Sequence, residues 1–160
     1  MRLRDVVEAE SALDRLFACH PKKARDGFRV ARIKREIAPI LTDYQDARQR
    51  LLEQHAVKSK TEPNRWQFVK VDEDGEPILE YAEDDQEKKS GKPVMDLDAF
   101  DAFSRELNEL TEAEEVTVES LITLAQIERL GLEPAMSPDE MSLLWWLIKE
   151  FREDTEVGDD

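Results

Sequence analysis

The sequence predicts a mainly α-helical protein: an antiparallel helical hairpin with an inserted β-hairpin and a C-terminal helix. Three observations predict this fold. Apolar residues recur at helical spacing over residues 1–18, 22–57 and 96–111. An Asp-Gly pair at 74–75 separates two short runs of aromatic and β-branched residues, which is typical of a β-hairpin. A Ser-Pro pair followed by two acids, at 137–140, is a strong helix start and leads into an apolar run.

The first two helices are separated by a proline. The first should end near Ala18, because Pro21 pushes the residue before it away from helical dihedral angles. The second should cover residues 22–57 and carries Pro39 in its middle, where proline removes one backbone hydrogen bond. The sequence leaves open whether Pro39 kinks this long helix or divides it.

The inserted β-hairpin is predicted at about residues 64–82. An isolated two-stranded hairpin is marginally stable in water, so we expect it to pack against the end of the long helix. The charged residues 83–92 that follow are expected to form a solvated loop.

The last part of the chain contains a third helix, an undecided segment and the C-terminal helix. The third helix should open near Asp96, with acids in its first turns, where the helix dipole favours negative charge. Within residues 114–132, the stretch after 120 fits either a strand or a short helix. Residues 1–152 are expected to form a single helical domain, and residues 153–160 a disordered acidic tail.

Composition excludes several classes of protein. The chain has 160 residues, one cysteine and a net charge of -15. A lone thiol excludes a disulfide framework and multi-thiolate metal centres. No apolar run approaches the ~20 residues of a membrane span, and the charged N-terminus does not resemble a signal peptide. We therefore expect a soluble, acidic, cytosolic protein with no membrane partner.

Charge is divided unevenly along the chain. Residues 1–60 contain 14 basic and 9 acidic side chains, whereas residues 61–160 contain 9 basic and 29 acidic ones. The basic stretch 22–35 is compatible with nucleic-acid binding. The overall negative charge opposes approach to phosphate, so we favour pairing of this stretch within the protein.

The residues that could support catalysis or metal binding are few. Cys19 and His20 are adjacent, but neighbours in the chain rarely aim their side chains at one another, and a small half-buried residue is the simpler interpretation. The second histidine, His55, lies at the far end of the long helix. The acids at 72–76 lack the spacing of a calcium loop. We expect no catalytic residues, no metal and no cofactor.

Two features could bind a partner. The adjacent Trp145 and Trp146 cannot share one narrow helical stripe, so their helix is either enclosed by its own chain or seated in another subunit or partner. The second feature is the density of carboxylates, which solubilises the protein or imitates nucleic acid. The residues predicted to bind a partner are Trp145, Trp146, Ile148, Asp84, Asp85 and Glu87.

Several strings resemble a family of small acidic phage and prophage proteins without an assigned activity. They are residues 36–37, 44–53, 105–110, 115–118 and 136–141, together with Phe100. The long insert 58–93 and Pro39 depart from the family pattern. The helix–hairpin–helix order is also similar to that of prefoldin-like chaperones. The resemblance implies a phage protein of the bacterial host cytoplasm or of the virion, with an accessory or virion-associated role. It brings no catalytic residues.

Together these observations predict a non-enzymatic phage or prophage protein that acts through protein–protein contacts as a structural or assembly factor. Its partner would be a phage structural protein, with a second copy of the chain as a further candidate. The alternative is an inhibitor of a host defence nuclease, in the manner of an anti-CRISPR, that uses its acidic surface as a nucleic-acid mimic.

Overall fold

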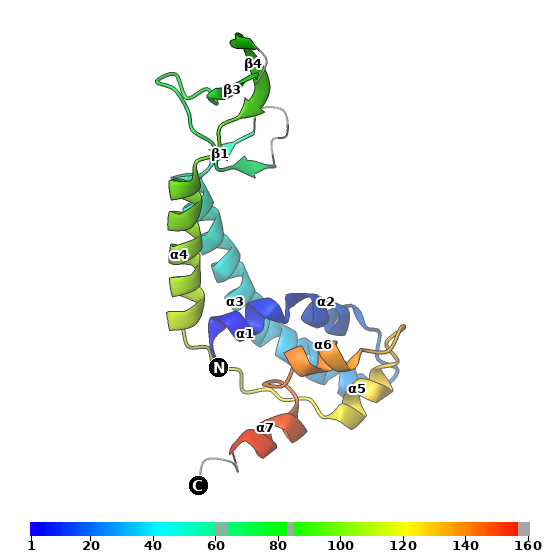
Figure 1. The fold of residues 1–160 in the computed structure, drawn as a ribbon. Coiled ribbons are helices and arrows are strands. Elements are labelled where there is room, and N and C mark those ends of the chain that lie inside the picture. The colour runs from blue at the N-terminus through cyan, green and yellow to red at the C-terminus, as the bar shows by residue number, and fades with distance from the viewer. Residues whose placement is uncertain (60–61, 63, 83–84, 157–160) are drawn as a thin grey trace. The chain divides into compact units, whose positions relative to one another are not determined.

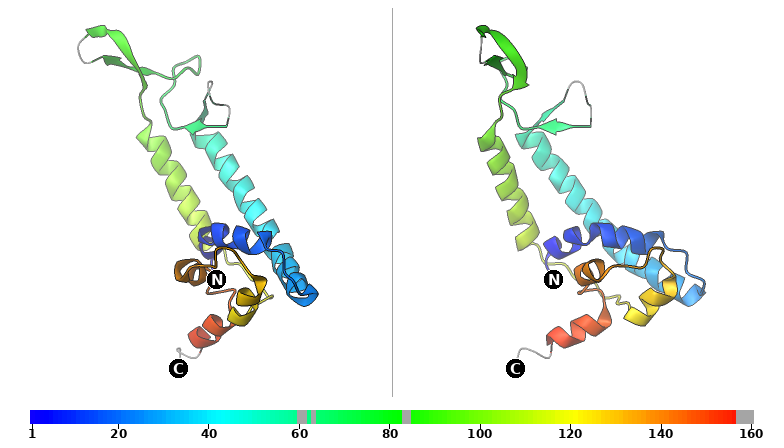
Figure 2. Two further views of the ribbon diagram at one scale, coloured as in Figure 1. Left: turned by 90° about the vertical axis from the view of Figure 1, so that its right-hand side faces the viewer. Right: turned by 45° about the vertical axis from the view of Figure 1, so that its right-hand side comes forward.

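The computed structural model describes residues 1–59, 62, 64–82 and 85–156 (Figures 1 and 2). As predicted, these residues are mainly helical and include one long helix. Their strands form two small antiparallel pairs, where the sequence predicted a single hairpin. The sequence predicted one domain, whereas the chain divides into two compact units. Unit 1 comprises Met1–Tyr44 and Leu110–Asp160, and unit 2 comprises Gln45–Glu109. Helices α3 (Ala24–His55) and α4 (Leu97–Ala113) each contribute residues to both units.

Unit 1 contains α1 (Leu3–Glu8), α2 (Glu10–Ala18), the first part of α3, α5 (Leu124–Leu130), α6 (Pro138–Leu143) and α7 (Lys149–Glu156). Its core is built from apolar residues that repeat at helical spacing on α1, α2 and α3 and from the segments around α5 and α6. The largest fully buried side chains are Val6, Leu13, Leu16, Ile33, Ile37, Val118, Ile122, Leu144, Trp146, Leu147 and Ile148.

Pro39 neither ends nor divides the long helix, because α3 is continuous from Ala24 to His55. The proline lacks the N–H that would bond to the carbonyl one turn earlier. On the turns that precede it, Ile33 and Ile37 are fully buried in the core of unit 1. Burial of these residues offsets the missing hydrogen bond and holds the helix together.

Part of the basic stretch 22–35 is used inside unit 1. Arg29 donates to the carbonyl of Leu121 at 2.8 Å. Buried Asp26, in the first turn of α3, forms an ion pair with Arg129 of α5 at 3.1 Å. The first contact uses one of the seven basic residues of the stretch, and the second uses its one acid before Glu36. The other six basic residues are exposed, so pairing of the whole stretch within the protein stays a prediction.

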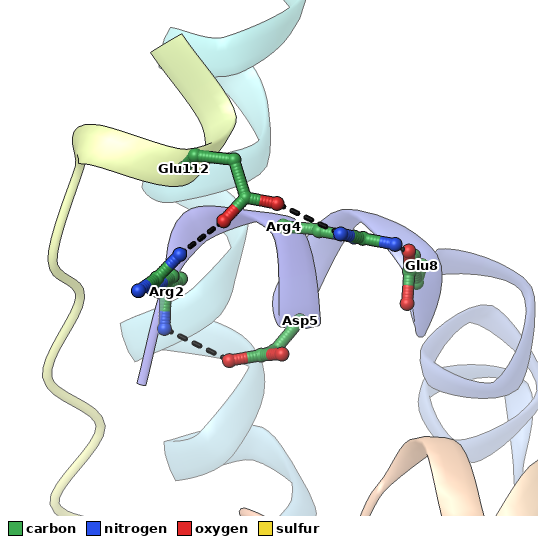
Figure 3. A network of polar contacts seen from close by, with 5 residues as sticks. All are labelled: Arg2, Arg4, Asp5, Glu8 and Glu112. Atoms are coloured by element: carbon green, nitrogen blue, oxygen red, sulfur yellow. Dashed lines mark hydrogen bonds and ion pairs between the residues drawn. The ribbon is translucent and has the colours of Figure 1, made fainter. Parts of the chain in front are cut away.

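The N-terminus of the chain is held by a network centred on Glu112, in the last turns of α4 (Figure 3). Arg2 and Arg4 both donate to the Glu112 carboxylate, Arg4 at 2.7 Å. Arg4 also donates to Glu8 at 2.7 Å, and Asp5 accepts a bond from the backbone N–H of Arg2 at 2.8 Å. The hydrogen bonds from Arg4 and Arg2 lower the pKa of the Glu112 carboxyl group.

The predicted C-terminal helix starts as expected but does not continue as one helix. Ser137 caps α6, accepting from the backbone N–H of Glu140 at 3.2 Å, and Pro138 is the first helical residue. The helix ends at Leu143, and a second helix, α7, begins at Lys149. The C-terminal helix is therefore two short helices joined by a turn.

The turn arises because the backbone between α6 and α7 bonds to a distant segment. Ile122 donates to the carbonyl of Leu147 at 3.0 Å and accepts from the N–H of Lys149 at 2.9 Å. These two bonds draw residues 147–149 towards Ile122 as a parallel bridge. Further on, α7 extends to Glu156, so residues 153–156 of the predicted disordered tail are helical, and residues 157–160 lie outside the described residues.

Unit 2 contains the end of α3, the start of α4 and two antiparallel strand pairs. Strand β1 (Val57–Lys58) pairs with β2 (Trp66–Gln67), and β3 (Leu79–Ala82) pairs with β4 (Asp85–Pro93). The two runs of the predicted hairpin meet around Gly75 through an isolated bridge between Val71 and Pro77 and a hydrogen bond from Ile78 to the carbonyl of Lys70 at 2.8 Å. The strands within these runs, β2 and β3, pair with β1 and β4 instead of with each other. Gly75 has a φ of 76°, a conformation that suits glycine.

The segment 83–92, predicted as a loop, is a strand from Asp85 onward. Its charged composition indicated a loop, but β4 pairs with β3 in the register Leu79↔Pro93. Pairing of backbone groups outweighs the low strand propensity of these residues. The loop prediction is therefore wrong for residues 85–92, and residues 83–84 lie outside the described residues.

Candidate functional site: an aromatic groove in unit 2

The predicted partner-binding residues of the C-terminal segment lie in different environments. Trp145 exposes 38% of its surface, whereas Trp146 exposes 2% and Ile148 none. No partner can reach Trp146 or Ile148 while unit 1 is folded, so the expectation that they bind a partner is corrected. The turn after α6 directs both side chains into the core of unit 1. Of the two alternatives that the sequence left open, enclosure by the same chain therefore applies to them. Trp145 alone of the three remains accessible.

The predicted acidic residues give little information about a binding surface. Asp84 lies outside the described residues, and Asp85 and Glu87 belong to strand β4. The strand also contains three lysines, at 88, 89 and 92. Its nine residues therefore hold more basic than acidic groups, which does not favour a nucleic-acid mimic built on this strand.

A groove of about 710 Å³ lies in unit 2, where α3, α4 and the segment around β2 meet. Its volume is within the ~300–1,000 Å³ range typical of ligand-binding pockets. Five of its lining residues are apolar or aromatic, and the others are polar or charged. The lining residues are Arg48, Leu52, Glu62, Asn64, Arg65, Trp66, Phe68, Phe100 and Phe103.

Three phenylalanine rings form one wall of the groove. Phe68 meets Phe100 edge to face, with ring centroids 5.3 Å apart, and meets Phe103 in a tilted arrangement at 5.1 Å. Such aromatic pairs add about 0.5–1.5 kcal/mol beyond the burial of their area. Phe103 is buried, whereas Phe100 exposes 46% of its surface. Phe100 is therefore the ring of this wall that is accessible from solvent.

Local sequence signals place these rings. Asp96 caps α4 by accepting from the N–H of Ala99 at 3.1 Å, and its own N–H donates to the carbonyl of Phe68 at 2.9 Å. Phe100 and Phe103 are three residues apart, so they share one face of the helix. The cap thus fixes the start of α4 against the segment that carries Phe68.

The opposite side of the groove belongs to α3. Leu52 is buried and lies four residues after Arg48, so both are on the same face of the helix. His55 and Glu106 are hydrogen-bonded at 3.0 Å and connect the end of α3 to α4. The last turns of α3 and the first turns of α4 lie side by side in the figures (Figures 1 and 2).

The charged groups around the groove differ in their partners. Arg65 is paired with Glu62 at 3.2 Å. Lys58 is placed over the ring of Trp66, 5.6 Å from its centroid, as a cation–π contact. Arg48 is exposed and has no ion-pair or hydrogen-bond partner among the described residues. The groove therefore combines an aromatic wall with the guanidinium group of Arg48, with which no described residue pairs.

Unit 2 also exposes an unusual number of apolar side chains. It contains five of the seven large hydrophobic residues that are exposed in the described chain. They are Val71, Ile78, Met95, Leu97 and Phe100. The backbone segments that carry three of them are joined by hydrogen bonds, such as that from Val94 to the carbonyl of Ile78 at 2.8 Å.

The residues considered for catalysis do not form a reactive arrangement. Cys19 and His20 line a separate cavity of about 350 Å³ in unit 1, together with Arg15 and Glu133. Burial raises the pKa of the Cys19 thiol, which keeps it in the weakly nucleophilic protonated form. His55 is engaged with Glu106. Within the described ranges, no group of three His, Cys, Asp or Glu side chains is arranged to hold a metal ion.

No family model matches this chain, and neither a curated protein nor a solved structure matches it. The resemblance to small acidic phage proteins thus stays a prediction. Of the helices that the structure describes, none combines the length and the apolar character needed to span a membrane.

Sequence analysis identified the parts of this groove but not the groove. Phe100 and Phe103 belong to the apolar periodicity of residues 96–111, and Trp66 and Phe68 to the first run of the predicted hairpin. The signal that could have pointed to a site is the excess of aromatic residues at these two places, with Trp66 and Phe68 two residues apart in an extended segment.

Proposed function

We propose that this chain is a non-enzymatic protein that acts by binding another protein, and that the groove of unit 2 is its contact surface. The observation that supports the proposal is the exposed Phe100 ring, backed by Phe68 and bordered by Trp66. Aromatic side chains, phenylalanine among them, are enriched at protein interfaces relative to the rest of the surface. The exposed apolar residues of unit 2 would extend the contact beyond the groove.

The architecture proposed for this function is a helical hairpin that carries strands at its tip. In unit 2, the end of α3 and the start of α4 would form the antiparallel arms, and the two strand pairs would be inserted between them. The His55–Glu106 hydrogen bond and the Asp96 cap support this arrangement. A rigid hairpin would present the groove without a large entropic cost on binding.

The biological role implied by the phage resemblance is that of a structural or assembly factor in the bacterial host. The partner would then be a phage structural protein. Inhibition of a host defence nuclease remains the alternative. The two differ in their response to salt, since an apolar contact changes little with ionic strength and an acidic mimic dissociates steeply.

The proposal can be tested with peptides selected from a random dodecapeptide display library on the full chain. A selected peptide should bind at least ~30-fold more weakly to Phe100→Ala, corresponding to a hot spot of about 2 kcal/mol. Trp145→Ala is the matched control, because it removes a similarly exposed aromatic side chain from unit 1. Loss of binding in Trp145→Ala with full binding in Phe100→Ala would place the contact elsewhere and contradict the proposal.

A further inference from the structure

We propose that the groove of unit 2 selects a protein segment in which an aromatic or aliphatic side chain is adjacent to an aspartate or glutamate, with Arg48 as the residue that recognises the carboxylate. This inference rests on the proposed function and adds the chemistry of the partner.

The apolar half of this specificity comes from the wall of the groove. Phe100 is half exposed, while Phe103 and Leu52, which also line the groove, are buried. A side chain of the partner that reaches this wall gains contact with rings that are already held in place by Phe68. The volume of about 710 Å³ leaves room for more than one side chain of a peptide.

The preference for an acidic residue in the partner comes from the charges of the side chains that line the groove. Glu62 is neutralised by Arg65 at 3.2 Å, so it opposes an incoming carboxylate only weakly. Arg48 has no partner among the described residues, and its guanidinium group matches a carboxylate with two parallel hydrogen bonds. The net charge that remains at the groove is positive and calls for one negative group on the ligand.

A nucleic acid could also stack on the aromatic residues and pair with the basic residues of the groove. The net negative charge of unit 2 disfavours it. Unit 2 contains 17 acidic and 10 basic residues. A polyphosphate chain would extend over this negative surface and be repelled along its length. A single carboxylate beside Arg48 meets only the local positive charge. The charge distribution therefore favours a peptide over a nucleic acid.

The test uses the full chain, the peptides selected by display and a pair of charge reversals. Arg48→Glu changes the groove, and Arg50→Glu makes the same change in net charge two residues away, outside the groove lining. Selected peptides should carry an acid beside their apolar anchor. They should bind about tenfold more weakly to Arg48→Glu and with unchanged affinity to Arg50→Glu. Replacing the acid of the peptide by lysine should restore binding to Arg48→Glu.

The other possible results would contradict the carboxylate inference alone or the proposed function as well. If binding depends on Phe100 but Arg48→Glu and Arg50→Glu behave alike, the carboxylate inference is wrong and the proposed function stands. If no selected peptide depends on Phe100, both fall. A single-stranded dT20 probe that binds the chain and is released by Arg48→Glu would identify the groove as a nucleic-acid site and overturn the inference.

Discussion

The ring of Phe100 meets the ring of Phe68 edge to face, with centroids 5.3 Å apart and ring planes at 82°. Phe68 follows β2, and Phe100 lies in the first turns of α4. The contact therefore joins the strand segment to the helix and leaves one face of Phe100 in solvent. A side chain that is both fixed and exposed is well suited to bind a partner.

The two phenylalanines of α4 are predicted to differ in their effect on stability. Phe103→Ala should lower the free energy of unfolding by about 3 kcal/mol, because it removes a buried ring. Phe100→Ala should cost about 1 kcal/mol, because nearly half of its surface is already exposed. Urea denaturation of both variants checks this. Equal losses would mean that Phe100 is a core residue and is not available to a partner.

The two adjacent tryptophans provide a second matched pair. Trp146→Ala is expected to destabilise unit 1 by about 3–5 kcal/mol, since it empties a fully buried site. Trp145→Ala should cost about 1 kcal/mol. Thermal unfolding followed by circular dichroism measures both. A larger loss from Trp145 would contradict the turn between α6 and α7.

Replacement of Pro39 should stabilise the long helix. Pro39→Ala restores the backbone hydrogen bond within an exposed part of α3 and should raise the free energy of unfolding by up to ~3 kcal/mol. Pro39→Gly restores the same bond but has a poor helix propensity, so its gain should be about 1 kcal/mol smaller. A loss of stability in both variants would show that the fold requires the proline.

Glu36 is predicted to stabilise unit 1 through its contacts with the segment before α5. Its carboxylate accepts from the backbone N–H groups of Glu119 and Ser120, each at 3.0 Å, and from the Ser120 hydroxyl group. Glu36→Gln should cost about 1–3 kcal/mol, because it weakens hydrogen bonds to a charged acceptor. Asp43→Asn, an exposed carboxylate on the same helix, is the control and should have little effect.

The contribution of Glu36 should depend on pH. Burial raises the pKa of Glu36, but the hydrogen bonds from Ser120 and Glu119 lower it by more, so the folded-state pKa lies below its ordinary value of 4.5. Its stabilisation is therefore present above pH ~4.5 and lost as the pH falls through the lower folded-state value. The difference in unfolding free energy between wild type and Glu36→Gln should shrink from pH 7 to pH 3. A difference that does not change with pH would contradict this assignment.

Local signals predicted the start of helices well, and distant contacts account for most of what they missed. Asp96 and Ser137 act within three residues of themselves, so their caps could be recognised in the sequence. The break after α6 depends on Ile122, far away in the chain, which bonds to the backbone at Leu147. Helical periodicity carries no information about such a partner.

The groove likewise contains features that local sequence predicts and features that depend on distant contacts. Each of its apolar residues belongs to a segment whose pattern the sequence displays, and the sequence also led us to expect the hairpin against the end of the long helix. Leu52 and Phe68 do line the same groove. Whether Arg48 has a partner depends on which carboxylates the packing brings near it, and none of the described ones pairs with it.

The most direct test of the central claim is a titration of the ¹⁵N-labelled chain with a selected peptide, followed by amide chemical shifts. The account predicts saturable shifts that are largest at Leu52, Phe68 and Phe100 and that disappear in Phe100→Ala. Shifts concentrated around Trp145, with the amides of the groove unchanged, would contradict it.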